Sequence, residues 1–182
     1  MSETTSPVPN ETVPVRLIGG PDDWHGQDLT IHTAAELAGP REALGTYLIS
    51  NHVPAGHPDP GARAVFEPDS EPAPATTWFF RGWFPYGPHD LENRTADQIV
   101  PVDVESDEEG LPTGWVTDEG ERHRVDRILA HWQANLEDDL GFGVWHVRSN
   151  DGADHELRAH PGHWEAGRLP ENLLQEHDDL LA

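Results

Sequence analysis

The chain has 182 residues and a mass of 20.2 kDa, and it contains no cysteine. This length suits one domain of ordinary size or two very small ones. Without cysteine the chain cannot form a disulfide, an iron–sulfur cluster, a thiolate nucleophile or a zinc site with Cys ligands. Any metal ion would have to bind histidine and carboxylate side chains.

Negative charge dominates the composition, with 34 acidic and 11 basic residues and a formal net charge of −23. Every basic side chain is an arginine. Such a surface repels nucleic-acid phosphates and anionic lipid, so we expect neither direct nucleic-acid binding nor membrane attachment. The sequence has no signal-peptide pattern and no membrane-spanning apolar run, which predicts a cytoplasmic protein. Solubility is the simplest explanation of the acidity.

The hydrophobic pattern predicts a polar, disordered tail at 1–12 and a first β module at 13–85. The segment Ala34–Gly45 has room for one helical turn, because Gly39-Pro40 ends any helix there. The remaining apolar stretches are separated by loops rich in proline and glycine and predict a five-stranded β-meander. The predicted strands are 13–18, 28–32, 46–49, 62–66 and 77–84.

A polar linker at 86–98 precedes a second β module at 99–170. Arg122–Gln133 is ambiguous within this module, because Val125, Ile128, Leu129 and Trp132 have helical spacing among strand-like neighbours. We expect a strand to about Asp126 and then a bulge or short helix to Ala134. The other predicted strands are 99–104, 114–117, 144–149, 155–159 and 164–169.

Residues 171–182 have the pattern of a short amphipathic helix, with Leu173, Leu174, Leu180 and Leu181 on its apolar side. The sequence therefore predicts a mainly β fold, α+β at most, with one or two short helices. Its two modules are small, antiparallel and of the β-meander or barrel-like kind.

Two resemblances accompany this pattern. The segments RLIGGPDDWHGQ at 16–27, GTY at 45–47, AVFEPD at 64–69 and WFFRGW at 78–83 resemble small uncharacterised proteins of actinobacteria and their phages. The second module is similar to an actinobacterial domain of unknown function, through Trp115, Arg122–Val125, Trp145 and Glu156–Arg158 among others. The matching residues are mostly aromatic residues and turn glycines, so the resemblances imply a fold rather than an activity.

The chain offers few residues for chemistry. His155, His160 and His163 are the nearest approach to a metal site, but they miss the H-E-x-x-H spacing, and on a strand positions 155 and 160 face opposite sides. Solvent-exposed histidines are the simpler interpretation. The sequence has no phosphate-binding loop, no dinucleotide fingerprint and no nucleophile elbow. We therefore expect no cofactor and identify no catalytic residue, although an enzyme is not excluded.

The seven tryptophans divide into two groups. Trp78, Trp83, Trp115 and Trp145 lie on predicted strands at positions that should face the core. Trp24, Trp132 and Trp164 are the candidates for partial exposure, although a core position is favoured for Trp132 and Trp164. Trp24 lies in a loop beside His25, where an aromatic side chain can anchor an interface.

These features favour a non-enzymatic, acidic protein-interaction module with a protein partner. The contact residues we expect are Trp24, His25, Trp132, Trp164 and the four C-terminal leucines. One alternative is a DNA mimic or inhibitor, whose carboxylates replace phosphates in the groove of a nucleic-acid enzyme. A second alternative is a metal-dependent hydrolase that uses His155, His160 or His163 with carboxylates.

Overall fold

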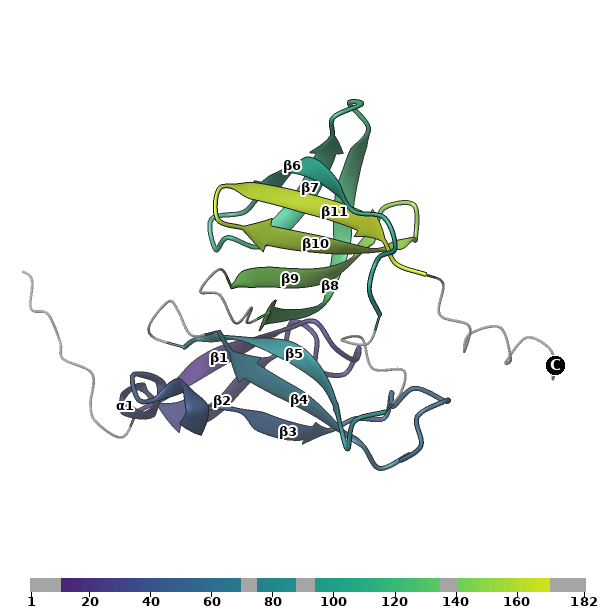
Figure 1. Cartoon of the computed structure of the whole chain (residues 1–182). Helices are drawn as coiled ribbons and strands as arrows, with labels where there is room; N and C mark the ends of the chain where they lie inside the picture. The colour runs from purple at the N-terminus through teal and green to yellow at the C-terminus, as the bar shows by residue number, and fades with distance from the viewer. Residues whose placement is uncertain (1–10, 70–74, 88–93, 135–140, 171–182) are drawn as a thin grey trace, which may run out of the picture.

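A computed structural model describes residues 11–69, 75–87, 94–134 and 141–170, which form two β units (Figure 1). The first unit is an open five-stranded sheet, and the second is a closed barrel of six strands. The mainly β class is confirmed, because the described helices are one short α-helix and one 3-10 turn. Within the described residues, no helix is long and apolar enough to cross a membrane.

The five strands of the first unit occur where the sequence predicts them. Their order across the sheet is β2-β1-β5-β4-β3, and β1 pairs with β5 in parallel. The sheet therefore differs from the expected antiparallel meander at one pairing. Alternation of apolar residues identifies the buried face of a strand but not its neighbour, and the long connection between β1 and β5 permits a parallel pair. The strands are β1 (Thr12–Ile18), β2 (Asp28–Thr33), β3 (Thr46–Ile49), β4 (Arg63–Pro68) and β5 (Thr77–Phe84).

A short helical segment follows β2, as predicted. Helix α1 (Ala34–Leu37) begins with a capping box, in which the Thr33 hydroxyl accepts from the Glu36 N–H at 3.3 Å and the Glu36 carboxylate accepts from the Thr33 N–H at 2.7 Å. The helix ends before Gly39-Pro40, and the 3-10 turn η1 (Arg41–Ala43) follows. Leu37 is fully buried, so α1 covers part of the sheet's core.

The core of the first unit is rich in aromatic residues. Trp78 and Trp83 are buried, as predicted, and Phe80 contacts both Trp83 and Phe66 through tilted or edge-on rings. The Trp78 indole N–H donates to the Ala75 carbonyl at 2.8 Å, so its one polar group is satisfied inside the core.

The second unit closes in the order β10-β11-β6-β7-β8-β9. Trp115 and Trp145 are buried inside the barrel, again as predicted, together with Val147 and Leu157. Because the barrel is closed, each of its six described strands has a neighbour on both sides. The strands are β6 (Val100–Ser106), β7 (Pro112–Thr117), β8 (Arg122–Ala134), β9 (Phe142–Ser149), β10 (Asp154–His160) and β11 (His163–Arg168).

Strand β8 resolves the ambiguity at 122–134 in favour of a strand throughout. Its register against β9 shifts between Val125 and Arg127 and again between Ile128 and Ala130. Residues three apart on a regular strand face opposite sides, but the first bulge lets Val125 and Ile128 both pack against the barrel core. After the second bulge, Ala130 packs in the core of the first unit. The bulges therefore produce the spacing that resembles a helix.

The two units share their cores. Ile18 and Phe79 of the first unit pack with the barrel's interior, and Ala130 of β8 packs with the first unit. The Gly20 N–H donates to the Leu129 carbonyl at 2.8 Å, which joins the chain after β1 directly to β8. The junction is thus a packed interface and not a flexible contact.

The second half of the predicted linker packs on the barrel. Arg94 forms an ion pair with Asp154 at 3.3 Å and donates to the Pro170 carbonyl at 2.7 Å. The Ala96 N–H donates to the buried Glu156 carboxylate at 3.3 Å. These contacts fasten residues 94–98 across β10 and β11.

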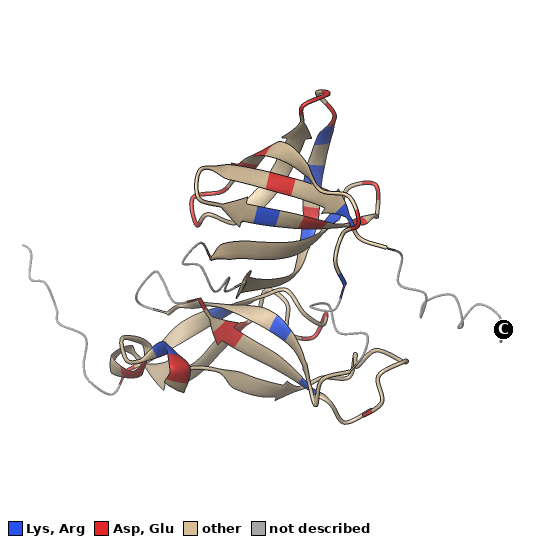
Figure 2. Cartoon of the chain, in the orientation of Figure 1, with Lys and Arg blue, Asp and Glu red and all other residues tan. Residues whose placement is uncertain are grey.

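Acidic residues occur on both units, as Figure 2 shows. They occupy several turns as well as strands, and arginines lie among them on the barrel. Among the described ion pairs, the Glu105–Arg122 pair is solvent-exposed at 2.9 Å, whereas the Asp69–Arg81 pair is largely buried at 2.7 Å.

Candidate functional site

Trp24 and His25 lie in the loop between β1 and β2, and both are half-buried. The Trp24 indole N–H donates to the Ile49 carbonyl at 2.8 Å, and its ring packs against the first core. The Gly19 N–H donates to Nδ1 of His25 at 3.0 Å. Burial, reinforced by the Arg127 guanidinium, holds the pKa of His25 below its ordinary value. Both side chains therefore hold the loop to the protein's own body.

Trp132 and Trp164 are also half-buried. Partial exposure is therefore confirmed for Trp24, whereas Trp132 and Trp164 are less buried than the core position favoured for them. Trp132 packs on the first core and lies nearly perpendicular to the buried His146 ring, with centroids 4.8 Å apart. Trp164 packs on the barrel core. The predicted contact residues Leu173, Leu174, Leu180 and Leu181 lie outside the described residues.

The structure separates the three histidines considered for a metal. His155 is at the start of β10, whereas His160 and His163 flank the hairpin turn between β10 and β11. The rings of His160 and His163 stack with centroids 4.7 Å apart, and Glu165 lies 3.1 Å from His160 and 3.8 Å from His163. The hairpin thus forms a small, partly exposed cluster without His155.

A surface that the sequence analysis missed lies on the first unit. Tyr47 and Ile49 on β3, Phe84 at the end of β5 and Tyr86 just beyond it are 59%, 68%, 48% and 63% exposed. The ring centroids of Tyr47 and Phe84 are 5.5 Å apart, and those of Phe84 and Tyr86 are 6.2 Å apart. We call this surface the aromatic edge, because β3 is the last strand of the sheet, on the side away from the barrel (Figure 1).

Strand register explains why these side chains meet. Ile49 pairs with Arg63 of β4, and Arg63 pairs with Phe84 of β5, so the three side chains form a row across one face. Leu48 points to the opposite face and packs on the core. Tyr47 and Ile49 are therefore the outward residues of a strand that is apolar on both faces. The run of apolar residues in TYLI, without polar alternation, is the feature of the sequence that could have predicted this surface.

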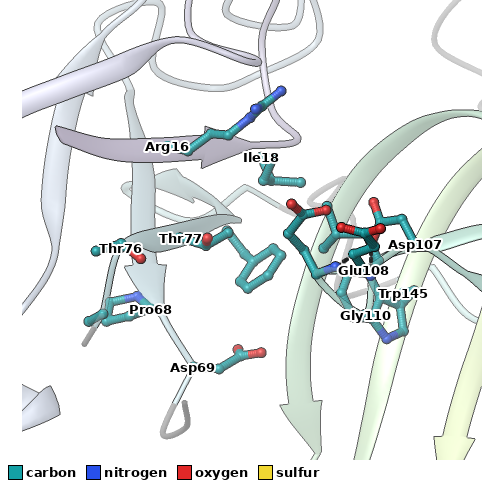
Figure 3. A pocket seen from close by; sticks show the side chains of 14 residues that line it. Arg16, Ile18, Pro68, Asp69, Thr76, Thr77, Asp107, Glu108, Gly110 and Trp145 are labelled. Atoms are coloured by element: carbon teal, nitrogen blue, oxygen red, sulfur yellow. Dashed lines mark hydrogen bonds between the residues drawn. The ribbon is translucent and has the colours of Figure 1, made fainter. Parts of the chain in front are cut away.

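A cavity of about 720 Å³ lies between the two units. Figure 3 shows Arg16 and Asp69 on the side of the first unit, and Glu108 and Trp145 on the side of the barrel. Phe79, Trp145 and Leu111 provide apolar lining, while the turn at 107–110 adds carboxylates. Such a lining can hold a ligand that combines an apolar body with a positive group.

Beside this cavity, Arg81, Asp69 and His131 form what we call the junction network. Arg81 donates to Asp69 Oδ1 at 2.7 Å, and His131 Nε2 lies 2.7 Å from Asp69 Oδ2. Burial opposes ionisation of Asp69, but the bonds from His131 and Arg81 outweigh it and hold the pKa of this carboxyl below its ordinary value. The network joins β4, β5 and β8.

The surroundings of His131 engage both of its ring nitrogens. Its Nδ1 lies 2.8 Å from the Val144 carbonyl, which can only accept, and its Nε2 faces the Asp69 carboxylate. The ring stacks on Trp145 at 3.7 Å and meets Phe79 edge-on at 4.8 Å. Both ring nitrogens therefore have partners within the protein, which supports a structural role for the network at the junction.

Comparisons with protein-family models, with curated proteins and with solved structures give no match for this chain.

Proposed function

We propose that this protein is a non-enzymatic interaction module that binds a protein partner through the aromatic edge. The observation that carries the proposal is the grouping of Tyr47, Ile49, Phe84 and Tyr86 on one exposed surface. The chain is otherwise highly polar, with a mean hydropathy of −0.65. Contiguous exposed apolar side chains on such a protein are typical of a binding surface, and Tyr and Phe are frequent anchors in interfaces.

The position of the aromatic edge favours a partner segment in extended conformation. β3 has a neighbouring strand on one side only among the described strands, which makes its free side a place for strand addition. The Ile49 carbonyl already accepts a hydrogen bond from the Trp24 indole N–H at 2.8 Å. Backbone pairing would therefore involve Thr46–Leu48, and the outward side chains of Tyr47 and Ile49 would contact alternate residues of the segment.

Charge favours a basic partner over a second copy of this chain. Each copy carries a formal charge of −23, so two copies repel each other, whereas a basic protein is attracted from a distance. We therefore propose a partner with apolar residues for the aromatic edge and Lys or Arg nearby.

The two alternative functions draw less support. A DNA mimic needs carboxylates in a row along one face, whereas Figure 2 shows acidic residues on several turns and strands of both units. The metal-dependent hydrolase relies on His155, His160 or His163 with carboxylates, and the structure separates His155 from the other two, which flank one hairpin turn.

The test compares captured proteins between matched variants. The double variant Tyr47→Ser/Ile49→Ser removes apolar area from the aromatic edge, and Ile31→Ser removes an equally exposed apolar side chain, 54% accessible, on the opposite edge strand β2. Tagged proteins are incubated with nuclease-treated lysate from the native host, and bound proteins are quantified by mass spectrometry at low and moderate salt.

We expect a partner that the wild type and Ile31→Ser retain equally and that the double variant loses, with less capture at the higher salt concentration. Equal capture by all three proteins would contradict the proposal. If the wild type self-associates in sedimentation velocity and the double variant does not, the aromatic edge binds a second copy of this chain and the proposed basic partner is wrong.

A further inference from the structure

A cluster of three ligand-type side chains lies at one end of the barrel, away from the aromatic edge. His123 is in the first part of β8, His155 is at the start of β10, and Asp151 is in the turn between β9 and β10. One potential ligand atom from each residue lies within 4.8 Å of the others. The strands bring these residues together from positions up to 32 apart in the sequence.

His155 has an unusual environment for an imidazole. Its side chain lies edge-on to Trp115 at 4.9 Å, and the residue is only 8% exposed. Its Nε2 is buried and has no hydrogen-bond partner among the described residues. A buried polar atom without a partner is costly, so its presence calls for a ligand that the nitrogen can bind.

The other two residues are held in place around it. The His123 ring stacks on Trp115 with centroids 4.7 Å apart, and it lies 5.5 Å from the His155 ring. One carboxylate oxygen of Asp151, Oδ1, accepts from the Ser149 hydroxyl and from the Ala153 N–H. These contacts fix the turn and leave the second oxygen of Asp151 outside those bonds, and hydrogen bonds of this kind orient many metal-binding carboxylates.

The charge states suit metal binding near neutral pH. Burial, reinforced by the neighbouring His123, lowers the pKa of His155, and the Ser149 hydroxyl bond lowers the pKa of Asp151. Metal ions bind the neutral imidazole and the ionised carboxylate, which are the forms these shifts favour. Two further charged groups lie near His155: Arg168, its partner in the β10–β11 pair, and Asp154, its neighbour in the chain.

Space is available beside the cluster. His123 and His155 both line a cavity of about 450 Å³, together with Thr117 and Arg168. Two imidazoles and one carboxylate are a common ligand set for zinc and its neighbours in the first transition series, and three protein ligands leave one position open. A water molecule or a small anion near Arg168 can occupy that position.

We propose that His123, Asp151 and His155 bind one divalent ion of the first transition series, with Zn²⁺ as the ion best suited to the set. The site is independent of the proposed partner surface. It also differs from the partly exposed His160–His163–Glu165 cluster, because only the proposed site contains a buried imidazole nitrogen without a hydrogen-bond partner among the described residues.

The test measures Zn²⁺ binding to the full chain without a histidine tag, after chelator treatment and in excess Mg²⁺ to occupy surface carboxylates. Isothermal titration gives affinity and stoichiometry for the wild type and for Asp151→Asn, which retains an oxygen acceptor for the turn. His123→Gln and His155→Gln test the imidazoles, and circular dichroism checks their fold. The double variant His160→Gln/His163→Gln is the matched control, because it removes imidazoles from the other cluster only.

We expect one Zn²⁺ per chain in the wild type and in the control, and a loss of affinity of about 100-fold or more in Asp151→Asn and His123→Gln. Substitution by Co²⁺ should give visible absorption bands that these two variants lack. Three outcomes would overturn the proposal: only weak binding at many sites, unchanged affinity in both variants, or loss of the tight site in the control. Because Asp151→Asn and His123→Gln test two different ligands, the proposal can be decided even if His155→Gln fails to fold.

Discussion

Removing the Asp69 carboxylate should weaken the junction between the two units more than any exposed ion pair. Asp69 accepts from Arg81 and His131, each at 2.7 Å, and the side chains of Asp69, Arg81 and His131 are 15%, 14% and 4% exposed. A hydrogen bond to a charged group contributes about 1.5–3 kcal/mol, and breaking a buried pair costs about 3–5 kcal/mol. Because the two contributions overlap, we expect Asp69→Ala to lower the free energy of unfolding by about 3–5 kcal/mol.

Urea unfolding followed by tryptophan fluorescence and by circular dichroism measures this loss. The fluorescence change should report on the junction, because Trp145 stacks on His131 at 3.7 Å. The matched control is Glu105→Ala, which breaks an ion pair with Arg122 whose side chains are 56% and 69% exposed, and it should cost less than about 1 kcal/mol. Equal, small losses in the two variants would refute the role assigned to the junction network.

Two further predictions concern backbone and pH. Gly19 and Gly26 both have positive φ, at 82° and 73°, but only at Gly19 would a Cβ meet the Leu129 carbonyl oxygen, at 2.6 Å. Gly19→Ala should therefore cost about 1–3 kcal/mol more than Gly26→Ala in urea unfolding, and equal costs would contradict this. Burial lowers the pKa of His146 below its ordinary 6.5, so the unfolded chain binds this proton more readily and stability falls as pH drops below that value. His146→Gln should flatten the decline between about pH 7 and pH 5, and an unchanged slope would show that another group causes it.

Local patterns are sufficient to locate the strands. Alternation and the turn residues predict all five strands of the first unit, and the four tryptophans predicted at core-facing strand positions are buried. Helix α1 also ends where Gly39-Pro40 requires. These features depend on a residue and its near neighbours in the chain, so the sequence carries them directly.

Long-range pairing accounts for what could not be predicted. The parallel pair of β1 and β5 depends on partners far away in the sequence. So does the choice in β8 between the bulge, which the structure has, and the short helix that the sequence also allowed. The aromatic edge arises for the same reason, because Ile49 and Phe84 meet only through Arg63 on the strand between them. Likewise, proximity in sequence groups His155 with His160 and His163, whereas barrel closure places it beside His123.

Site-specific photo-crosslinking in cells of the native host tests the central claim most directly. A benzophenone amino acid replaces Tyr47, which is 59% exposed on the aromatic edge, and in a parallel strain it replaces Ile31, which is 54% exposed on the other edge strand. Our account predicts that irradiation links position 47 to one basic protein and that position 31 gives no such adduct. An absence of adducts at position 47, or the same adducts at both positions, would contradict it.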